Sequence, residues 1–372
     1  MAIKTETMKS CPFRPLSDLV AMCRNRKPCS AICLAEAVIL LLCILTLFAM
    51  NGCSREEQEV VVYTSVDDIF ARPVARKFQK NTGIMVKLVT DTEETKSTGL
   101  LNRLIAEKDR PVADVFWSGD PVRAALLKAK GVSAPYHSPG AAGLPAEFSD
   151  PDGYWSSFST RARMLIYNSK KLRGDMVPSS IFDMNDKRFQ GRACIANPMF
   201  GTTSMHAAAL FQVLGPPKAK KFFEDFARNG GKVLASNGDV KQRVADGTCL
   251  IGLTDSDDVS TALSAGSPVG FVFPDQDGIG TLLIPNAAVL IKGAPHQEQA
   301  RKFIDFLLSP DTERMLAKSA AAQIPLRKGI KGPQIFPPVD KIKTMKVDYQ
   351  QLALTLEKIM KDFLKEWTDQ NS

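Results

Sequence analysis

Hydrophobic and polar positions along the chain form blocks that predict strands followed by helices. Residues 60–65 are a continuous β-branched run, and residues 66–83 then place apolar side chains at helical spacing and end at Gly83. The same order recurs in residues 84–109 and again in residues 113–131. Three such units in succession predict a parallel sheet with crossover helices. In sheets of this kind, ligand sites lie where strands end and loops enter helices.

A second alternating series follows a surface stretch rich in Gly, Pro and Ser at residues 138–154. Residues 159–172 first predict a strand in which Arg161 and Arg163 alternate with apolar residues. The pattern then predicts strands at residues 192–198, 232–236, 248–254, 267–274 and 281–293, and helices at residues 181–191, 202–215, 219–231, 239–247, 296–320 with a break at Pro310, and 347–367. The chain is therefore expected to be α/β throughout, and its 372 residues favour two domains over one.

The first fifty residues depart from this pattern. A positive cluster of Arg24, Arg26 and Lys27 precedes an apolar run at residues 37–50, which suits the core of a signal peptide better than a membrane span. The run ends in MNGCS, which resembles a bacterial lipoprotein box. We expect cleavage before Cys53 and diacylation of that cysteine, with an uncleaved signal anchor as the alternative. Both readings place the folded body outside the cytoplasm.

Charge and cysteine content narrow the classes further. The leader holds six Lys or Arg and three Asp or Glu, so five of the eight net positive charges belong to the body, where they are dispersed. Without a concentrated basic patch, nucleic acid is not expected as a partner. Only Cys194 and Cys249 lie in the body. A disulfide between them is one reading, but we favour two small buried apolar side chains.

Four stretches of the body are similar to one known family. Residues 60–121, 189–210, 245–258 and 271–310 resemble, in order and spacing, the ferric-ion-binding proteins of bacterial periplasmic iron transport. These belong to the solute-binding proteins of ATP-driven (ABC) importers. The resemblance implies an α/β, type II periplasmic binding protein fold, with two lobes, a cleft between them and two hinge crossings.

The resemblance also implies a division of the chain and a role. The expected parts are a lipoprotein-type signal peptide at 1–52, a tether at 53–58, a first lobe of 59–160 plus 282–335, a second lobe of 161–281, and a C-terminal helix at 336–372 that packs on the lobes. The crossings are expected near Met164 and Ile284. The implied role is that of a monomeric receptor, lipid-anchored at the cell envelope, that delivers a solute to ABC permease subunits without catalysis or cofactor.

Four loops are expected to line the cleft, because each follows a strand or opens a helix. The ligand-binding candidates in them are Ser65, Asp67, Asp68, Ser118, Asp120, Thr202, Thr203, Ser204, Asp255, Ser256, Asp257 and Asp258. Helix N-termini present unpaired N–H groups, so residues 202–204 suit an anion, although the same residues also serve as ordinary helix caps. Residues 95–99 open another helix, and there we favour capping.

The chain lacks the family's usual ferric ligands. Ferric binders of this family carry two adjacent tyrosines after the strand that corresponds to CLIGL, and here Ser256, Asp257 and Asp258 occupy that place. The histidine that some members use after the first strand is also missing. The chain offers carboxylates instead, and neighbouring carboxylates repel unless a cation or donor compensates them.

Two ligand classes would suit these carboxylates, and the sequence leads us to expect the first, with the second as the alternative. The first is ferric iron or another hard cation such as calcium or manganese, held in an all-oxygen metal site by Asp67, Asp120, Asp257 and Asp258, with Asp255 nearby. The second is an organic phosphate or aminoalkylphosphonate, whose ammonium would meet the acids while its anion meets a helix N-terminus. A third reading assigns Asp255 and Asp258 to local turns and caps.

Other functions find less support in the sequence. There is no nucleophile elbow, zinc-ligand helix or phosphate-binding glycine loop, so an enzyme is not expected. His137, His206 and His296 are not spaced as metal ligands, and we expect structural or surface roles for them. A ligand-sensing module would use the same cleft as a transport receptor and stays open as an alternative.

Overall fold

The computed structural model describes residues 58–91 and 98–371. They form part of one compact unit, Glu57–Ser372. The signal peptide, Cys53, the tether up to residue 57 and residues 95–97 therefore lie outside the described residues. Within the described ranges, no helix combines the length and the apolar character needed to cross a membrane.

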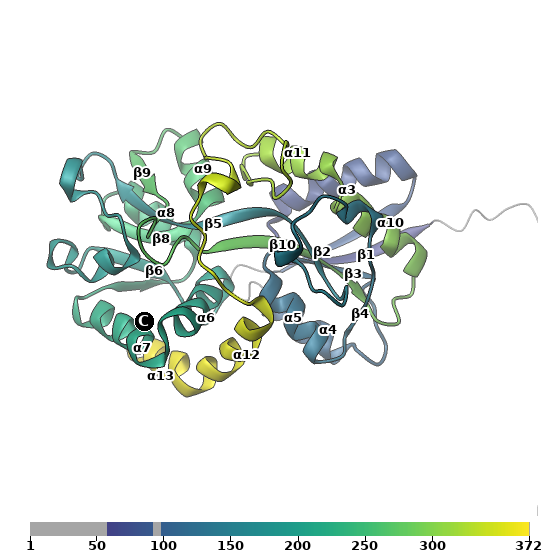
Figure 1. Ribbon diagram of the computed structural model, residues 1–372, viewed down its shortest axis with the longest axis horizontal. Coiled ribbons are helices and arrows are strands. Elements are labelled where there is room, and N and C mark those ends of the chain that lie inside the picture. Colours follow the sequence, from purple (N-terminus) through teal and green to yellow (C-terminus); the bar gives the residue numbers. More distant parts are fainter. Residues whose placement is uncertain (1–57, 92–97, 372) are drawn as a thin grey trace, which may run out of the picture. The chain divides into compact units, whose positions relative to one another are not determined.

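Ten strands join in one continuous arrangement (Figure 1). They are β1 (Glu59–Thr64), β2 (Met85–Thr90), β3 (Val115–Ser118), β4 (Ser133–Ala134), β5 (Ser156–Asn168), β6 (Ala193–Ala196), β7 (Lys232–Leu234), β8 (Ile251–Asp255), β9 (Val269–Val272) and β10 (Leu283–Ile291). Their order is β2-β1-β3-β10-β5-β8-β6-β7, with β4 beside β10 and β9 beside β5.

The strands fall into two groups that share β5. We call β1, β2, β3, β4 and β10 the first strand group, and β6, β7, β8 and β9 the second. β1 is parallel to β2 and β3, and β6 is parallel to β7 and β8, as the strand-then-helix pattern predicts. The start of β5 pairs with β10, and its end pairs with β8 and β9. β5 therefore carries the chain from one group to the other, at the place expected for a crossing.

The helices that accompany these strands follow the predicted order. They are α3 (Asp68–Thr82), α4 (Gly99–Ala106), α5 (Pro121–Ala129), α6 (Gly201–Leu214), α7 (Pro216–Arg228), α8 (Asn237–Ala245), α9 (Ser256–Ser264), α10 (Gln297–Leu307), α11 (Pro310–Lys318), α12 (Tyr349–Ile359) and α13 (Lys365–Asn371), the last two joined by a π-helical turn at Met360–Leu364. The break at Pro310 is confirmed, because this proline opens α11.

One predicted helix is wrong. Residues 181–191 form two 3₁₀ helices, Ile181–Asn185 and Lys187–Phe189, instead of one α-helix. The side chain of Asp186 accepts a hydrogen bond from the Arg188 amide and caps the second of them. A cap in the middle of the segment restarts the backbone hydrogen bonding, so a continuous helix does not form.

An irregularity in β5 sets the direction of two arginines. Pro285 of β10 faces Thr160 and Asn286 faces Phe158, so Ser159 is an extra residue, with a φ of 40°. Such a bulge changes which face of the sheet the following side chains point to. Arg161 and Arg163 follow it two residues apart, and therefore share one face of β5.

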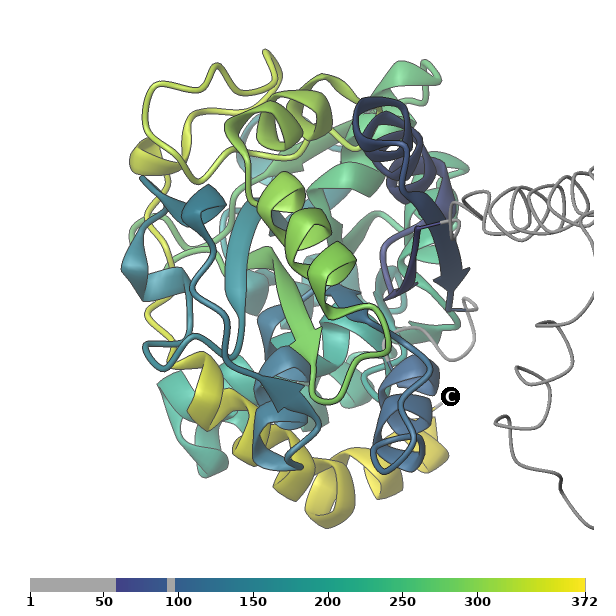
Figure 2. The same cartoon turned by 90° about the vertical axis from the view of Figure 1, so that its right-hand side faces the viewer.

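Buried apolar side chains cover both faces of the strands. On one face α3 and α10 pack together, with the rings of Phe78 and Phe303 5.0 Å apart. On the other face a single cluster runs through α4, α5, α6, α7 and α12, and so lies under both strand groups. Figures 1 and 2 show the yellow C-terminal helices along the same edge as α5 and α6. The C-terminal helices thus pack against both groups, whereas the residue boundaries of the two lobes stay a prediction.

Candidate functional site

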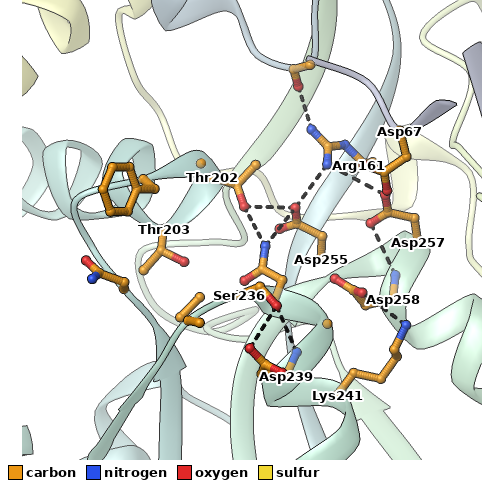
Figure 3. Close-up of a pocket in the computed structure, with 18 of the residues that line it drawn as sticks. Asp67, Arg161, Thr202, Thr203, Ser236, Asp239, Lys241, Asp255, Asp257 and Asp258 are labelled. Atoms are coloured by element: carbon orange, nitrogen blue, oxygen red, sulfur yellow. Dashed lines mark hydrogen bonds and ion pairs between the residues drawn. The ribbon is translucent and has the colours of Figure 1, made fainter. Parts of the chain in front are cut away.

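A cavity of about 370 Å³ lies where the two strand groups meet (Figure 3). The first group contributes Ser65 and Asp67 after β1, and Gly119 after β3. β5 contributes Arg161. The second group contributes the starts of α6, α8 and α9, which follow β6, β7 and β8. The cavity therefore lies at the carboxyl ends of parallel strands, as expected for an α/β sheet.

Seven of the twelve predicted ligand-binding residues line this cavity. They are Ser65, Asp67, Thr202, Thr203, Asp255, Asp257 and Asp258. The strand pairing brings the last three, from the end of β8 and the start of α9, to the same cavity as Asp67 at the start of α3. The arrangement joins loops from both strand groups around one space.

The other predicted residues serve the local structure around the cavity. Asp68 forms an exposed ion pair with Arg72 one turn along α3. Ser118 donates a hydrogen bond to the backbone oxygen of Asp120 at 2.6 Å. The Asp120 carboxylate is buried, caps α5 by accepting from the Arg123 amide at 3.0 Å, and lies 3.5 Å from the Arg123 guanidinium.

Two serines are also committed to the scaffold. Ser204 donates to the Gly201 oxygen and accepts from Arg123 at 2.7 Å, which links α5 to α6. Ser256 is buried and accepts from the Ala162 amide of β5 at 3.1 Å. These hydrogen bonds hold the first turns of the helices around the cavity. Neither serine lines the cavity itself.

The predicted metal site of Asp67, Asp120, Asp257 and Asp258 is not assembled. Among residues 58–91 and 98–371, no group of three or more His, Cys, Asp or Glu side chains is arranged to hold a metal ion. Asp120 is paired with Arg123 and does not line the cavity. The remaining carboxylates do not need a metal ion to balance their charge, because an arginine side chain of the protein supplies a positive charge among them.

The Arg161 side chain lies among the acids (Figure 3). Its Nη1 is 3.1 Å from Asp255 Oδ2 and 3.6 Å from Asp257 Oδ2. Its Nη2 donates to the backbone oxygen of Gly119 at 2.5 Å, so one guanidinium joins the first strand group to the second. Burial without a counter-ion would be costly for these carboxylates, and Arg161 provides the compensation.

Arg163 stabilises the same cluster from beneath. It is fully buried, and its Nη1 donates to Asp255 Oδ1 at 2.7 Å and to Thr202 Oγ1 at 3.0 Å. Its Nη2 donates to Thr203 Oγ1 at 3.2 Å. The sequence analysis identified both arginines as alternating with apolar residues and did not assign them to the site. The available signal was that two arginines occupy a strand that otherwise reads as buried, where unpaired charges are rare.

The two neighbouring acids respond differently to this environment. Burial favours the neutral form of Asp255, but the charges of Arg163 and Arg161 outweigh it and hold the pKa of Asp255 below its usual value. Burial raises the pKa of Asp257 to about 7, against the effect of Arg161 and with the help of Asp258 and other nearby carboxylates. Near neutral pH, Asp257 is therefore present in both its protonated and its ionised form, whereas Asp255 stays ionised.

The opposite wall of the cavity consists of helix starts and hydroxyl groups. No side chain caps α6, which begins at Gly201 with a φ of 54°. A backbone of that kind leaves amide N–H groups of the first turn available to a ligand. The α8 start contributes Ser236 and Asn237, and Asn237 donates to Thr202 Oγ1 at 2.9 Å. The Thr202 hydroxyl itself donates to Asp255 Oδ2 at 2.8 Å, and the carboxylate of Asp239 also lines the cavity here, so the donors that remain for a ligand are the first-turn amides.

His206, one turn into α6, has a structural role. Its side chain is buried behind the cavity wall. Burial, together with the positive charge of Arg163, lowers its pKa to about 3, so the imidazole stays neutral. This agrees with the role expected from the sequence.

A cavity between two α/β strand groups, with loops from both groups around it, defines a two-lobed solute receptor of the type II periplasmic binding protein fold. Residues 74–338 match the family model described as "Bacterial extracellular solute-binding protein", and the chain belongs to this family. It is a periplasmic solute-binding protein of ABC importers. Proteins of this family are solute receptors that interact with permeases, and they are not enzymes.

Named relatives point to more than one solute. The chain is 29% identical to iron uptake protein A1 of Synechocystis over 74% of this chain and 79% of the relative. It is 24% identical to the major ferric iron-binding protein of Neisseria meningitidis serogroup A, over 80% of this chain and 90% of the relative. It is 26% identical to a periplasmic protein of Salmonella typhi named for binding 2-aminoethylphosphonate, over 74% of this chain and 82% of the relative.

Solved structures share the fold. Iron-bound HitA from Pseudomonas aeruginosa superposes with a TM-score of 0.72 at 23% identity, covering 82% of this chain and 99% of HitA. AfuA from Actinobacillus pleuropneumoniae, with fructose-6-phosphate bound, superposes with a TM-score of 0.74 at 21% identity, covering 85% of this chain and 99% of AfuA. At this level of identity the structural similarity establishes the type II fold and does not identify the solute.

Proposed function

We propose that the cavity binds a small zwitterion that carries an ammonium group and a phosphonate or phosphate group. The observation that carries this proposal is the position of Arg161, 3.1 Å from Asp255 and 3.6 Å from Asp257. Arg161 already neutralises part of the carboxylate charge, so the cavity is better suited to the single positive charge of an ammonium than to a multivalent metal ion. A solute that offers both charges matches its mixed walls.

The ammonium end of the solute would face the acidic wall. Asp67, Asp257 and Asp258 lie together on one side of the cavity in Figure 3. Asp258 is held by Thr254 at 2.8 Å and by Lys241 at 3.4 Å, which keeps its carboxylate in place. An approaching ammonium would favour the ionised form of Asp257, because opposite charges lower a carboxyl pKa.

The anionic end of the solute would face the start of α6. Gly201, Thr202 and Thr203 line the cavity there, and the helix dipole and amide groups of a first turn attract phosphate oxygens. The relative named for binding 2-aminoethylphosphonate supports a phosphorus oxyanion as the ligand class.

Binding would act by closure, since loops from both strand groups contact one solute. Thermal unfolding of the protein with 2-aminoethylphosphonate tests the proposal. A ligand bound only by the native state raises the free energy of unfolding by about 2.7 kcal/mol at a concentration 100-fold above Kd, and the melting temperature rises with it. Ethylphosphonate and ethanolamine, each lacking one charge, are expected to act much more weakly.

Variants separate the cavity from the rest of the surface. Asp257→Ala is expected to abolish the thermal response to 2-aminoethylphosphonate. Asp340→Ala, at an exposed position away from this cavity, is the matched control and should keep it. An undiminished response of the Asp257 variant would exclude that residue as a ligand, and no response of the native protein would reject the zwitterion.

Ferric iron or another hard cation is the second candidate solute. It is favoured by the relatives named for iron. The same thermal experiment with ferric citrate, Ca²⁺ and Mn²⁺ discriminates the two. A response to the metal salts, together with none to 2-aminoethylphosphonate, would make the cation the solute.

We further propose that the protein is a monomeric lipoprotein anchored through Cys53, with lobes divided as expected from the sequence. The MNGCS box supports the anchor. Intact mass of the protein extracted from membranes tests it, since the mature chain should begin at Cys53 and carry acyl chains. Cys53→Ser should leave the protein unacylated, and a native protein that retains residues 1–52 would contradict the proposal.

A further inference from the structure

A buried carboxylate from another part of the chain lies next to the bulge of β5. Glu313 belongs to α11 and is fully buried. Its Oε1 accepts hydrogen bonds from the backbone amide of Ser159 at 3.0 Å and from that of Leu326 at 2.8 Å. Ser159 is the extra residue of the bulge, so the register of β5 with β10 gives it no partner. Glu313 therefore supplies the acceptor that the strand pairing does not.

An ion pair holds Glu313 from its other side. Its Oε2 accepts from Arg327 Nη1 at 2.9 Å, and Arg327 is itself buried. The same arginine donates through Nε to the Ala142 oxygen at 3.1 Å and through Nη2 to the Leu308 oxygen at 2.6 Å. Removing one partner of such a buried pair is strongly destabilising. The fold around the pair thus fixes the carboxylate in one place beside the bulge.

The backbone between the bulge and Arg161 is held as well. Thr160 exchanges two hydrogen bonds with Ile324, from its amide at 2.7 Å and to its oxygen at 2.8 Å. The side chain of Asn286, in β10, donates to the Ser159 oxygen at 3.1 Å. Arg161 is the next residue along β5, and its guanidinium lies in the cavity among the acids. The conformation that Glu313 stabilises is therefore passed directly to the residue that carries the internal cation.

We propose that Glu313 is a positioning residue for the solute site, which selects the bulged register of β5 and so directs Arg161 into the cavity. Without this carboxylate, the Ser159 amide would be buried and unpaired, which is unfavourable. A slip of β5 by one residue against β10 would remove the bulge, but it would turn Arg161 to the opposite face of the sheet. Asp255 and Asp257 would then lose their shared cation. This role does not depend on which solute the cavity binds.

A double-mutant cycle in the full chain tests the proposal. Urea unfolding at pH 8 is measured for the native protein, Glu313→Ala, Arg161→Met and the double variant. The hydrogen bonds of the two side chains go to different residues, and substitutions at separate sites normally have additive effects. We expect Glu313→Ala to change the unfolding constant at least about tenfold less in the Arg161→Met background than in the native protein, because the contribution of Arg161 is already lost there.

Asp114→Ala is the matched control for this cycle. Asp114 is also a fully buried carboxylate that accepts two backbone amides, from Val61 at 2.7 Å and from His296 at 2.7 Å. It stands immediately before β3, and the other end of that strand leads to the cavity. Its effect should be the same within about twofold in both backgrounds. Coupling as large as that of Glu313 would show a general response to a lost buried carboxylate and overturn the proposal.

A second variant separates the contact with Ser159 from the ion pair. Glu313→Gln keeps an oxygen for the Ser159 amide and loses the charge that pairs with Arg327, so its effect should be nearly additive with that of Arg161→Met. Coupling as large as that of Glu313→Ala would place the effect in the ion pair and reject the role of the bulge. Additive effects of Glu313→Ala, within about twofold, would reject the proposal outright. If Glu313→Ala does not fold, Glu313→Asp, one methylene shorter, replaces it with the same expected coupling.

Discussion

Replacement of Arg161 by methionine tests whether this residue is the internal cation of the site. Methionine keeps an unbranched apolar side chain, shorter than that of arginine, and carries no charge. The variant loses the contacts to Asp255 at 3.1 Å, Asp257 at 3.6 Å and the Gly119 oxygen at 2.5 Å. Unit charges at these separations attract by about 5 kcal/mol at an effective dielectric constant of about 20. The solvation of the charges offsets part of this, and breaking a buried pair costs about 3–5 kcal/mol.

The expected loss is near the lower end, about 3 kcal/mol, because Asp255 keeps Arg163 at 2.7 Å. It should also depend on pH. At pH 5 Asp257 is protonated in both proteins, since its pKa is about 7 in the native structure and higher without Arg161. At pH 8 native Asp257 is ionised beside Arg161, whereas the variant must keep it protonated or bury an unpaired charge. The loss should therefore be larger at pH 8 than at pH 5, by about 1.4 kcal/mol for one pH unit above the pKa.

Urea unfolding at pH 5 and pH 8 measures both quantities. Arg314→Met is the matched control, because Arg314 forms an exposed ion pair with Asp311 and should contribute under about 1 kcal/mol. We also expect Ca²⁺ and Tb³⁺ to raise the melting temperature of the Arg161 variant more than that of the native protein, since the carboxylates then lack their cation. A loss below about 1 kcal/mol, or an equal loss at both pH values, would refute the role given to Arg161.

Two further predictions concern a carboxyl group and a packing contact. The folded state holds the Asp257 proton more tightly than the unfolded state, in which the pKa of this carboxyl is near 3.8. Its contribution to the free energy of unfolding is therefore complete below about pH 4, and on the order of 4 kcal/mol is lost as the pH rises to about 7. In urea unfolding, Asp257→Asn should flatten this fall of stability with pH, and an unchanged pH profile would show that the group titrates normally. Trp367 is buried, its ring N–H donates to the Phe223 backbone oxygen at 3.2 Å, and its ring meets the Phe223 ring edge to face with centroids 5.2 Å apart. Trp367→Ala should therefore lower the free energy of unfolding by about 3–5 kcal/mol, whereas Leu354→Ala, at a position 52% exposed, should change it little; equal effects would contradict the packing of the C-terminal helices.

Most helices and strands could be predicted because the signals that define them are local. The run at residues 60–65 contains most of β1, and the proline at 310 opens α11 after α10 ends at Leu307. Hydrophobic periodicity and caps act within a few residues, so a single sequence contains them. The segment at residues 181–191 was predicted wrongly, because two short 3₁₀ helices, each with its own cap, have the amino-acid composition of one α-helix although their backbone hydrogen bonding is interrupted.

The candidate site was predictable only in part. Residues at strand ends, such as Asp67 and Asp257, could be named from sequence, since loops at those positions line α/β clefts. The roles of Asp120 and Arg161 could not. Whether a carboxylate faces a cavity or pairs with an arginine depends on packing against residues far along the chain.

The sequence by itself therefore determined the alternation of strands and helices, the family, and the concentration of carboxylates after β8. Only the tertiary structure decided what balances those carboxylates. Arg161 and Asp255 are 94 positions apart, and they meet because β5 pairs with both β10 and β8 and because the bulge at Ser159 sets the face of the residues after it. Strand order and parity of this kind are properties of the assembled sheet, so no local pattern of residues records them.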